Sequence, residues 1–244
     1  VQFTDGGRRW KCNVCGTFNE VPVEYFCTTD AAGIRRDLAE RPELNSGTVE
    51  YVAPAEYMVR PPMPPTYVFA FDVSYPSVAS GMLQSAIEAV RGCLDSLPGG
   101  ERTQVALLTY DSTIHFYNMR QDASAPHMLV VPDASNPYLP QPDDLLVNLQ
   151  ESREQIGTTL DIISRSFAKT QETEGSLTGA VQAAYLVAQH VGGKVLLFQA
   201  SIPTVGEGEI RLKDDLSAYD TDKECALRMP THPFFKRFGG ECNR

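Results

Sequence analysis

The chain contains 244 residues, of which 42% are hydrophobic and 21% are charged, a balance typical of a globular protein with a sizeable core. No segment approaches the roughly 18 consecutive apolar residues of a membrane span. We see no N-terminal signal pattern either, so we expect reduced cysteine thiols in the cytosol. The net charge of −10 argues against broad nucleic-acid binding.

Residues 1–27 are predicted to form a small cysteine-containing unit. The segment CNVCG places Cys12 and Cys15 at a spacing that lets two thiolates face one zinc ion, and Gly16 relieves the turn beneath them. A structural zinc site needs four ligands, but no second CxxC or CxxH occurs, and Cys27 lies too far along the chain. We predict structural zinc at Cys12 and Cys15 in an intact protein, with two ligands missing from this stretch. Two free thiols are the alternative.

Residues 28–66 are predicted to connect this unit to a larger domain. The polar residues 28–47 are typical of an exposed connection, and the alternation in TVEYVAP (Thr48–Pro54) predicts one strand. The proline-rich residues 60–65 should be extended and hinge-like, because proline fixes φ and disfavours a helix before it.

Residues 67–244 are predicted to form an α/β domain with a mostly parallel sheet flanked by helices. Apolar runs predict buried strands, and apolar residues at helical spacing predict amphipathic helices between them. The expected strands are YVFAFDV from Tyr67, Gln104–Tyr110, IHFYN, Met128–Val131 and Lys194–Ala200; the expected helices carry Leu83 to Leu97, Ile156 to Phe167, Leu177 to Ala188, and HPFFKRF near the end. Strands alternating with helices favour this class.

The first strand of this domain ends in FDVSYPS, which resembles the metal-binding pattern D-x-S-x-S of von Willebrand A-type domains. Asp72 and Ser74 match the pattern, but Pro76 stands where a hydroxyl ligand is required. A second loop, SLTGAV, offers Ser176 and Thr178. The third loop should supply an aspartate after Lys194–Ala200, but it reads Ala-Ser. Hard oxygen ligands from all three loops are needed for Mg²⁺. We therefore predict a degenerate, empty site at Asp72, Ser74 and Thr178.

Nothing in the sequence favours an enzyme. The four histidines are dispersed, and the chain contains no GxSxG, P-loop or GxGxxG motif. His115 falls in a strand-like segment and is interpreted as a packing or surface residue.

Five segments in order, WKCNVC, TVEYVAPAEYMVRPP, FDVS, TYDSTIHFYNM and DDLLVNLQES, together resemble the cargo-selecting subunits of the COPII vesicle coat. The resemblance implies a four-cysteine zinc ribbon followed by a trunk domain of von Willebrand A type. It also implies that this chain is a fragment, which starts after the first CxxC of the ribbon and ends before the trunk is complete.

The family resemblance also implies a function by binding. It predicts pairing with a sister coat subunit, contact with the coat's small GTPase and outer coat, and peripheral contact with the membrane at endoplasmic reticulum exit sites and on vesicles. Cargo and membrane-fusion proteins are the expected ligands, and Arg102 matches a family arginine associated with the latter. An exposed turn arginine is the alternative for Arg102. Arg8, Arg9 and Lys11 form a basic cluster that would face anionic lipid or solvent.

Three other functions stay open at this point. The sister subunit has the same ribbon and trunk but activates the GTPase. A von Willebrand A plus zinc scaffold could serve a nuclear DNA-repair or transcription complex. A metal-dependent adhesion domain is the third, although Pro76 and Ala200 argue against it.

Overall fold

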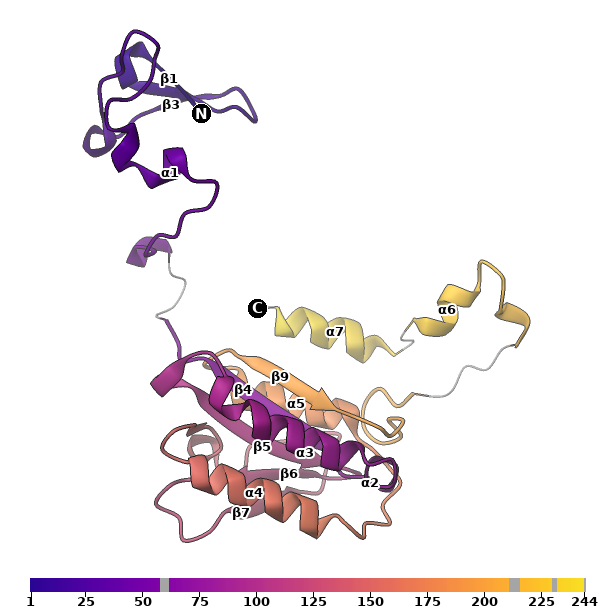
Figure 1. The fold of residues 1–244 in the computed structure, drawn as a ribbon. Helices are drawn as coiled ribbons and strands as arrows, with labels where there is room; N and C mark the ends of the chain where they lie inside the picture. The colour runs from indigo at the N-terminus through magenta and orange to yellow at the C-terminus, as the bar shows by residue number, and fades with distance from the viewer. Residues whose placement is uncertain (58–61, 211–215, 230–231, 244) are drawn as a thin grey trace. The chain divides into compact units, whose positions relative to one another are not determined.

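The computed structural model describes residues 1–57, 62–210, 216–229 and 232–243, and the chain divides into two compact units, Val1–Pro61 and Pro62–Arg244 (Figure 1). The boundary falls in the proline-rich segment 60–65, whose first two residues lie outside the described part. Among the described residues, no helix combines the length and the apolar character that a membrane crossing requires.

The first unit is built on a small antiparallel sheet of three short strands, which the sequence patterns did not predict. Its strands are β1 (Gln2–Thr4), β2 (Arg9–Lys11) and β3 (Phe18–Glu20), in that spatial order. The unit also contains 3-10 helices at Asp5–Gly7, Val23–Tyr25, Leu38–Glu40 and Ala55–Tyr57, and the short helix α1 (Pro42–Asn45). Each strand is too short to alternate over more than one repeat, so periodicity could not reveal it.

The predicted strand at Thr48–Pro54 is wrong. These residues belong to no strand, and the side chains of Tyr51 and Val52 are 66% and 96% exposed. An extended segment without a neighbour makes no ladder hydrogen bonds, so its alternating sequence alone cannot hold it in a sheet.

The second unit is an α/β domain with one mixed sheet. Its strands are β4 (Thr66–Asp72), β5 (Gln104–Tyr110), β6 (Ile114–Asn118), β7 (His127–Val131), β8 (Val147–Asn148) and β9 (Lys194–Phe198). Its helices are α2 (Tyr75–Ala79), α3 (Met82–Cys93), α4 (Arg153–Ser166), α5 (Leu177–Ala188), α6 (Glu224–Arg228) and α7 (Pro233–Cys242), with 3-10 helices at Leu94–Ser96, Gly100–Arg102, Pro142–Asp144 and Leu216–Ala218. The α/β class and the long helices are confirmed.

The parallel part of the sheet is its centre. The strand order is β7-β6-β5-β4-β9, with β4 parallel to both β5 and β9. On the other side β6 runs antiparallel to β5 and to β7, and β8 adds a short antiparallel pair with β5. Only residues 111–113 separate β5 from β6, and so short a turn allows only an antiparallel hairpin. The expectation of a mostly parallel sheet therefore holds for the centre alone.

The central strand β4 is buried on both faces, which explains its continuous apolar sequence. Phe69 and Phe71 point into a cluster with α3 and α4, while Val68 and Ala70 point into a second cluster with α5. Figure 1 shows α3 and α4 on one face of the sheet and α5 on the other. Burying one such side chain contributes about 1.5–3 kcal/mol, so this strand anchors the unit.

Candidate functional site

The two predicted metal-binding cysteines lie on the hairpin that joins β2 to β3. The Cys12 N–H donates to the Thr17 carbonyl at 2.9 Å, and the Gly16 N–H donates to the Cys12 carbonyl at 3.0 Å. Gly16 has φ of +73°, a left-handed conformation that glycine adopts without steric cost. This closed turn holds both thiols on one short loop, as a pair of ligands to one ion requires.

The electrostatics of the hairpin favour a thiolate at Cys15. Hydrogen bonding from Thr17, with a smaller contribution from Cys12, lowers the pKa of the Cys15 thiol to about 7. The Cys15 and Thr17 side chains lie 3.2 Å apart. Because zinc binds cysteine as the thiolate, a lowered pKa favours metal binding near neutral pH.

The donor set fits half of a structural zinc site. Within the described residues, no three His, Cys, Asp or Glu side chains gather closely enough to hold a metal ion. Cys27 does not join the hairpin, because its thiol points at the Thr28 carbonyl, 3.6 Å away. The hairpin would therefore supply two thiolates, and a four-coordinate zinc ion would need two more ligands from elsewhere.

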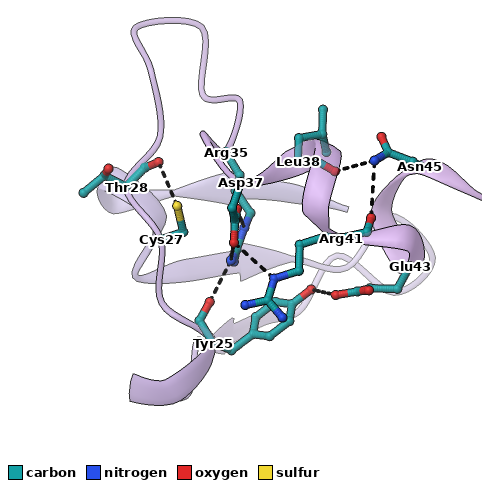
Figure 2. A network of polar contacts seen from close by, with 9 residues as sticks. All are labelled: Tyr25, Cys27, Thr28, Arg35, Asp37, Leu38, Arg41, Glu43 and Asn45. Carbon is teal, nitrogen blue, oxygen red and sulfur yellow. Dashed lines mark hydrogen bonds and ion pairs between the residues drawn. The ribbon is translucent and has the colours of Figure 1, made fainter. Parts of the chain in front are cut away.

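The polar segment after Cys27 is largely exposed, as predicted, but it packs onto the ribbon through Arg35, which is buried (Figure 2). The Arg35 guanidinium donates to both carboxylate oxygens of Asp37, at 2.9 and 2.8 Å, and to the Tyr25 carbonyl at 2.8 Å. It also lies between the rings of Phe3 and Tyr25, with centroid distances of 4.9 and 4.4 Å. Arginine suits this position because its planar guanidinium can stack on aromatic rings and at the same time make paired hydrogen bonds to a carboxylate.

Two further contacts close this network. Arg41 donates to Asp37 at 3.1 Å and covers the Tyr25 ring at 4.6 Å. The hydrogen bond from Arg35, followed by the one from Arg41, holds the pKa of Asp37 well below its usual range. Sequence patterns missed this network, since a stacked arginine leaves no periodic signal.

Asp72, at the end of β4, is fully buried and accepts five hydrogen bonds. Its Oδ1 accepts from the N–H of Ser74 at 2.9 Å and from the Ser74 hydroxyl at 2.6 Å. Its Oδ2 accepts from the Ala200 N–H at 2.9 Å, from the Ser201 N–H at 2.8 Å and from the Ser201 hydroxyl at 2.7 Å. Burial alone would raise the pKa of Asp72, but these hydrogen bonds outweigh it and leave the pKa lowered. The carboxylate thus joins β4 to the loop after β9.

The other predicted ligands of this degenerate site lie in the same part of the fold. Pro76 lies in the first turn of α2, a position that proline favours. Ser176 and Thr178, at the start of α5, are buried, and their hydroxyls have no hydrogen-bond partner within the described residues. That the site holds no ion stays a prediction. Ser201, which stands where the pattern requires an aspartate, instead donates two of the five hydrogen bonds to Asp72.

His115 lies in the core rather than in a reactive site. Its ring nitrogens lie 3.1 Å from the Thr109 hydroxyl and 3.0 Å from the Thr113 hydroxyl. Burial lowers its pKa, which keeps the ring neutral near pH 7. It therefore acts as a satisfied packing residue of β6.

Arg102 ends the 3-10 turn Gly100–Arg102 before β5, and its side chain is exposed. Its guanidinium forms no salt bridge within the part of the chain that the structure describes. The turn lies beside β8, because the Asn148 side chain donates to the Glu101 carbonyl at 2.6 Å. This arrangement leaves Arg102 available to a partner, and its role stays a prediction.

Comparisons with known proteins match both units of the chain. The Sec23/Sec24 trunk domain model matches residues 62–244, and the Sec23/Sec24 zinc finger model matches residues 1–25. The chain is 49% identical to the protein transport protein SEC24 A of Arabidopsis thaliana and 40% identical to Sec24A of Mus musculus. Both alignments cover all of this chain, and 24% and 22% of the relatives.

A crystal structure of the human COPII-coat protein Sec24c is similar in fold. It aligns with a TM-score of 0.88 and 34% identity over 99% of this chain and 33% of that one. The chain therefore spans about a quarter of the length of the curated relatives it matches.

Proposed function

The chain belongs to the Sec23/Sec24 family, and we propose that it is part of a coat subunit that selects cargo for vesicles leaving the endoplasmic reticulum. The observation that carries the proposal is homology to Sec24 proteins over the whole chain, at 49% identity to the Arabidopsis thaliana relative. This homology favours the cargo selector over its sister subunit. The name of the solved relative, a COPII-coat protein, supports the assignment to that coat.

The subunit would act by binding, without turnover. Its trunk would pair with the sister subunit, and the assembled coat would contact the small GTPase, the outer coat, cargo and membrane-fusion proteins. It would work in the cytoplasm, peripherally attached to exit sites and vesicles. Arg102 is a candidate contact because it is exposed on a turn and forms no ion pair with the described residues.

Structural zinc is part of the proposal, with Cys12 and Cys15 as two of its ligands. The closed hairpin, the lowered pKa of Cys15 and the zinc-finger match support it. Zinc would add folding free energy to a unit whose core is small. No catalytic role is assigned to the ion.

The basic cluster beside the hairpin is a candidate membrane contact. Arg8, Arg9 and Lys11 are exposed, and each would contribute about 1 kcal/mol near an anionic surface. Arg9 is partly neutralised by Asp5 and Glu20, at 3.8 and 3.9 Å, so Arg8 and Lys11 would carry most of the attraction.

Size-exclusion chromatography of the intact protein that contains this chain, alone and with the purified sister subunit, tests the coat assignment. A stable one-to-one complex is the expected result. Two separate peaks would contradict the proposed pairing. Tight, salt-dependent binding to duplex DNA would then favour the scaffold function.

A further inference from the structure

An open cleft of about 520 Å³ lies on the second unit, apart from the hairpin and from Asp72. One wall is the segment that follows β6, with Arg120 and Asp122. The other wall is the segment that leads through β8 into α4, from Asp143 to Ser152. The two walls come from distant parts of the sequence, so only the folded chain forms this cleft.

The cleft carries an excess of negative charge. Four carboxylates line it, those of Asp122, Asp143, Asp144 and Glu151, against the single cation of Arg120. Arg120 is already engaged: it pairs with Asp122 at 2.8 and 2.7 Å and with Asp144 at 2.9 Å. The carboxylates of Asp143 and Glu151 are exposed and form no ion pair within the described residues. A cation that enters the cleft would therefore meet two unneutralised carboxylates.

Ser152, a largely buried residue whose hydroxyl is uncommitted, is a second feature of the cleft. Ser152 lines the cleft, yet the residue is only 4% exposed. It is the N-cap of α4, but its side chain does not cap the helix and forms no hydrogen bond within the described residues. The Ser152 oxygen is not among the fully buried atoms that lack a partner, so it is open to solvent and to a hydrogen bond from a ligand in the cleft.

The cleft suits a long cationic side chain better than a metal ion. Within the described ranges, no three carboxylates or other ligating groups converge as an ion requires. Leu146, which is half-buried, also lines the cleft and offers apolar surface to an aliphatic stem. An anionic membrane would be repelled by the same carboxylates.

We propose that this cleft binds an arginine or lysine side chain that a protein partner presents in an exposed peptide segment. Its charged head would lie between Asp143 and Glu151, within reach of the Ser152 hydroxyl, and its stem would lie along Leu146. The proposal rests on the proposed function, since cargo or another coat component would supply the peptide. It adds a class of partner, a basic peptide, that the family assignment does not specify.

The test measures binding of a fluorescein-labelled short peptide to the full chain by fluorescence anisotropy. The peptide carries two arginines around a leucine, with glycine and serine elsewhere. The variant is Asp143→Asn with Glu151→Gln, which removes both free carboxylates without breaking an ion pair. Glu174→Gln is the matched control, because Glu174 is also exposed and forms no ion pair within the described residues, but it lies outside the cleft.

We expect the peptide to bind, and the double variant to weaken binding by up to about 25-fold, since each exposed ion pair is worth up to about fivefold in affinity. The Glu174→Gln variant should bind the peptide with the affinity of the unsubstituted protein. A peptide with glutamates in place of the arginines should not bind. Equal affinity of the double variant and the unsubstituted protein would overturn the proposal, and so would failure of the unsubstituted chain to bind.

Two outcomes separate this proposal from the coat assignment. If the double variant still elutes with the sister subunit while peptide binding is lost, both proposals stand. If the sister complex forms but the peptide never binds, the cleft proposal fails and the coat assignment is untouched. Peptide binding without a sister complex would contradict the coat assignment alone.

Discussion

The Asp72→Asn substitution should destabilise the second unit, although it replaces only one oxygen of the side chain by an NH₂ group. Asp72 accepts three backbone N–H groups and two hydroxyls. The asparagine must place an NH₂ group at one of the two oxygen positions. The hydroxyls of Ser74 and Ser201 can rotate and accept, but a backbone N–H cannot.

The less costly orientation places the NH₂ against Ser74, where one backbone N–H loses its acceptor. A hydrogen bond to a charged group is worth about 1.5–3 kcal/mol, and an unpaired buried donor costs about 1–3 kcal/mol. Because these terms overlap, we expect the free energy of unfolding to fall by about 2–4 kcal/mol. The other orientation, with the NH₂ group toward the loop after β9, would leave the N–H groups of Ala200 and Ser201 without an acceptor and would cost more.

Hydrogen exchange of the amides of β4 measures this effect within the full chain. These amides lie in the most buried strand, so their exchange reports opening of the unit. A loss of 2–4 kcal/mol corresponds to roughly 30- to 1,000-fold lower protection. Asp133→Asn is the control, because Asp133 is exposed and accepts one backbone N–H, from Ser135 at 3.0 Å. Protection in Asp72→Asn within threefold of the control would refute the reasoning.

The pH dependence gives a second check on Asp72. Its pKa is lowered in the folded state, so its contribution is complete above the ordinary aspartate value of about 3.9. That contribution is lost as the pH falls through the lowered, folded-state pKa. The difference between Asp72→Asn and the unsubstituted protein should therefore be constant at neutral pH and shrink only in acid. Added Mg²⁺ should not increase protection, and an increase would contradict the predicted empty site.

Three further predictions concern the two units. Cys15→Ser in the intact protein, where two further ligands would complete the site, should remove one equivalent of protein-bound zinc by colorimetric assay, whereas Cys27→Ser should not; equal zinc content in both would contradict the ligand assignment. Arg35→Lys should lower the free energy of unfolding of the first unit by about 2–4 kcal/mol, because lysine cannot stack on the aromatic rings and make the paired hydrogen bonds to Asp37 at the same time. Limited proteolysis within residues 28–47 should then be faster, and an unchanged cleavage rate would count against the network. Phe69→Ala should lower the free energy of unfolding, measured in urea, by about 3–5 kcal/mol, whereas Val195→Ala, at an exposed position, should lower it by less than about 1 kcal/mol. Similar urea midpoints for the two variants would contradict this prediction.

The sequence by itself determined the long elements of the second unit. The strand that contains Phe69 and the helix that contains Ile87 were predictable, since a buried strand or an amphipathic helix repeats its apolar pattern over several residues. The turn in CNVCG was predictable as well, because CxxC spacing and a glycine that adopts positive φ are local requirements, whereas the strands on either side of it were not.

Only the tertiary structure decided which side chains meet. The pairing of Asp72 with Ser201 joins residues far apart in the sequence, and no spacing rule connects them. Arg35 is polar and lies in a polar segment, so its burial between two aromatic rings could not be read from composition. The strand predicted at Thr48–Pro54 failed for the opposite reason, since its pattern was right but no strand within the described residues pairs with it. Periodicity records the burial of each element, whereas contacts between elements depend on how the whole chain packs.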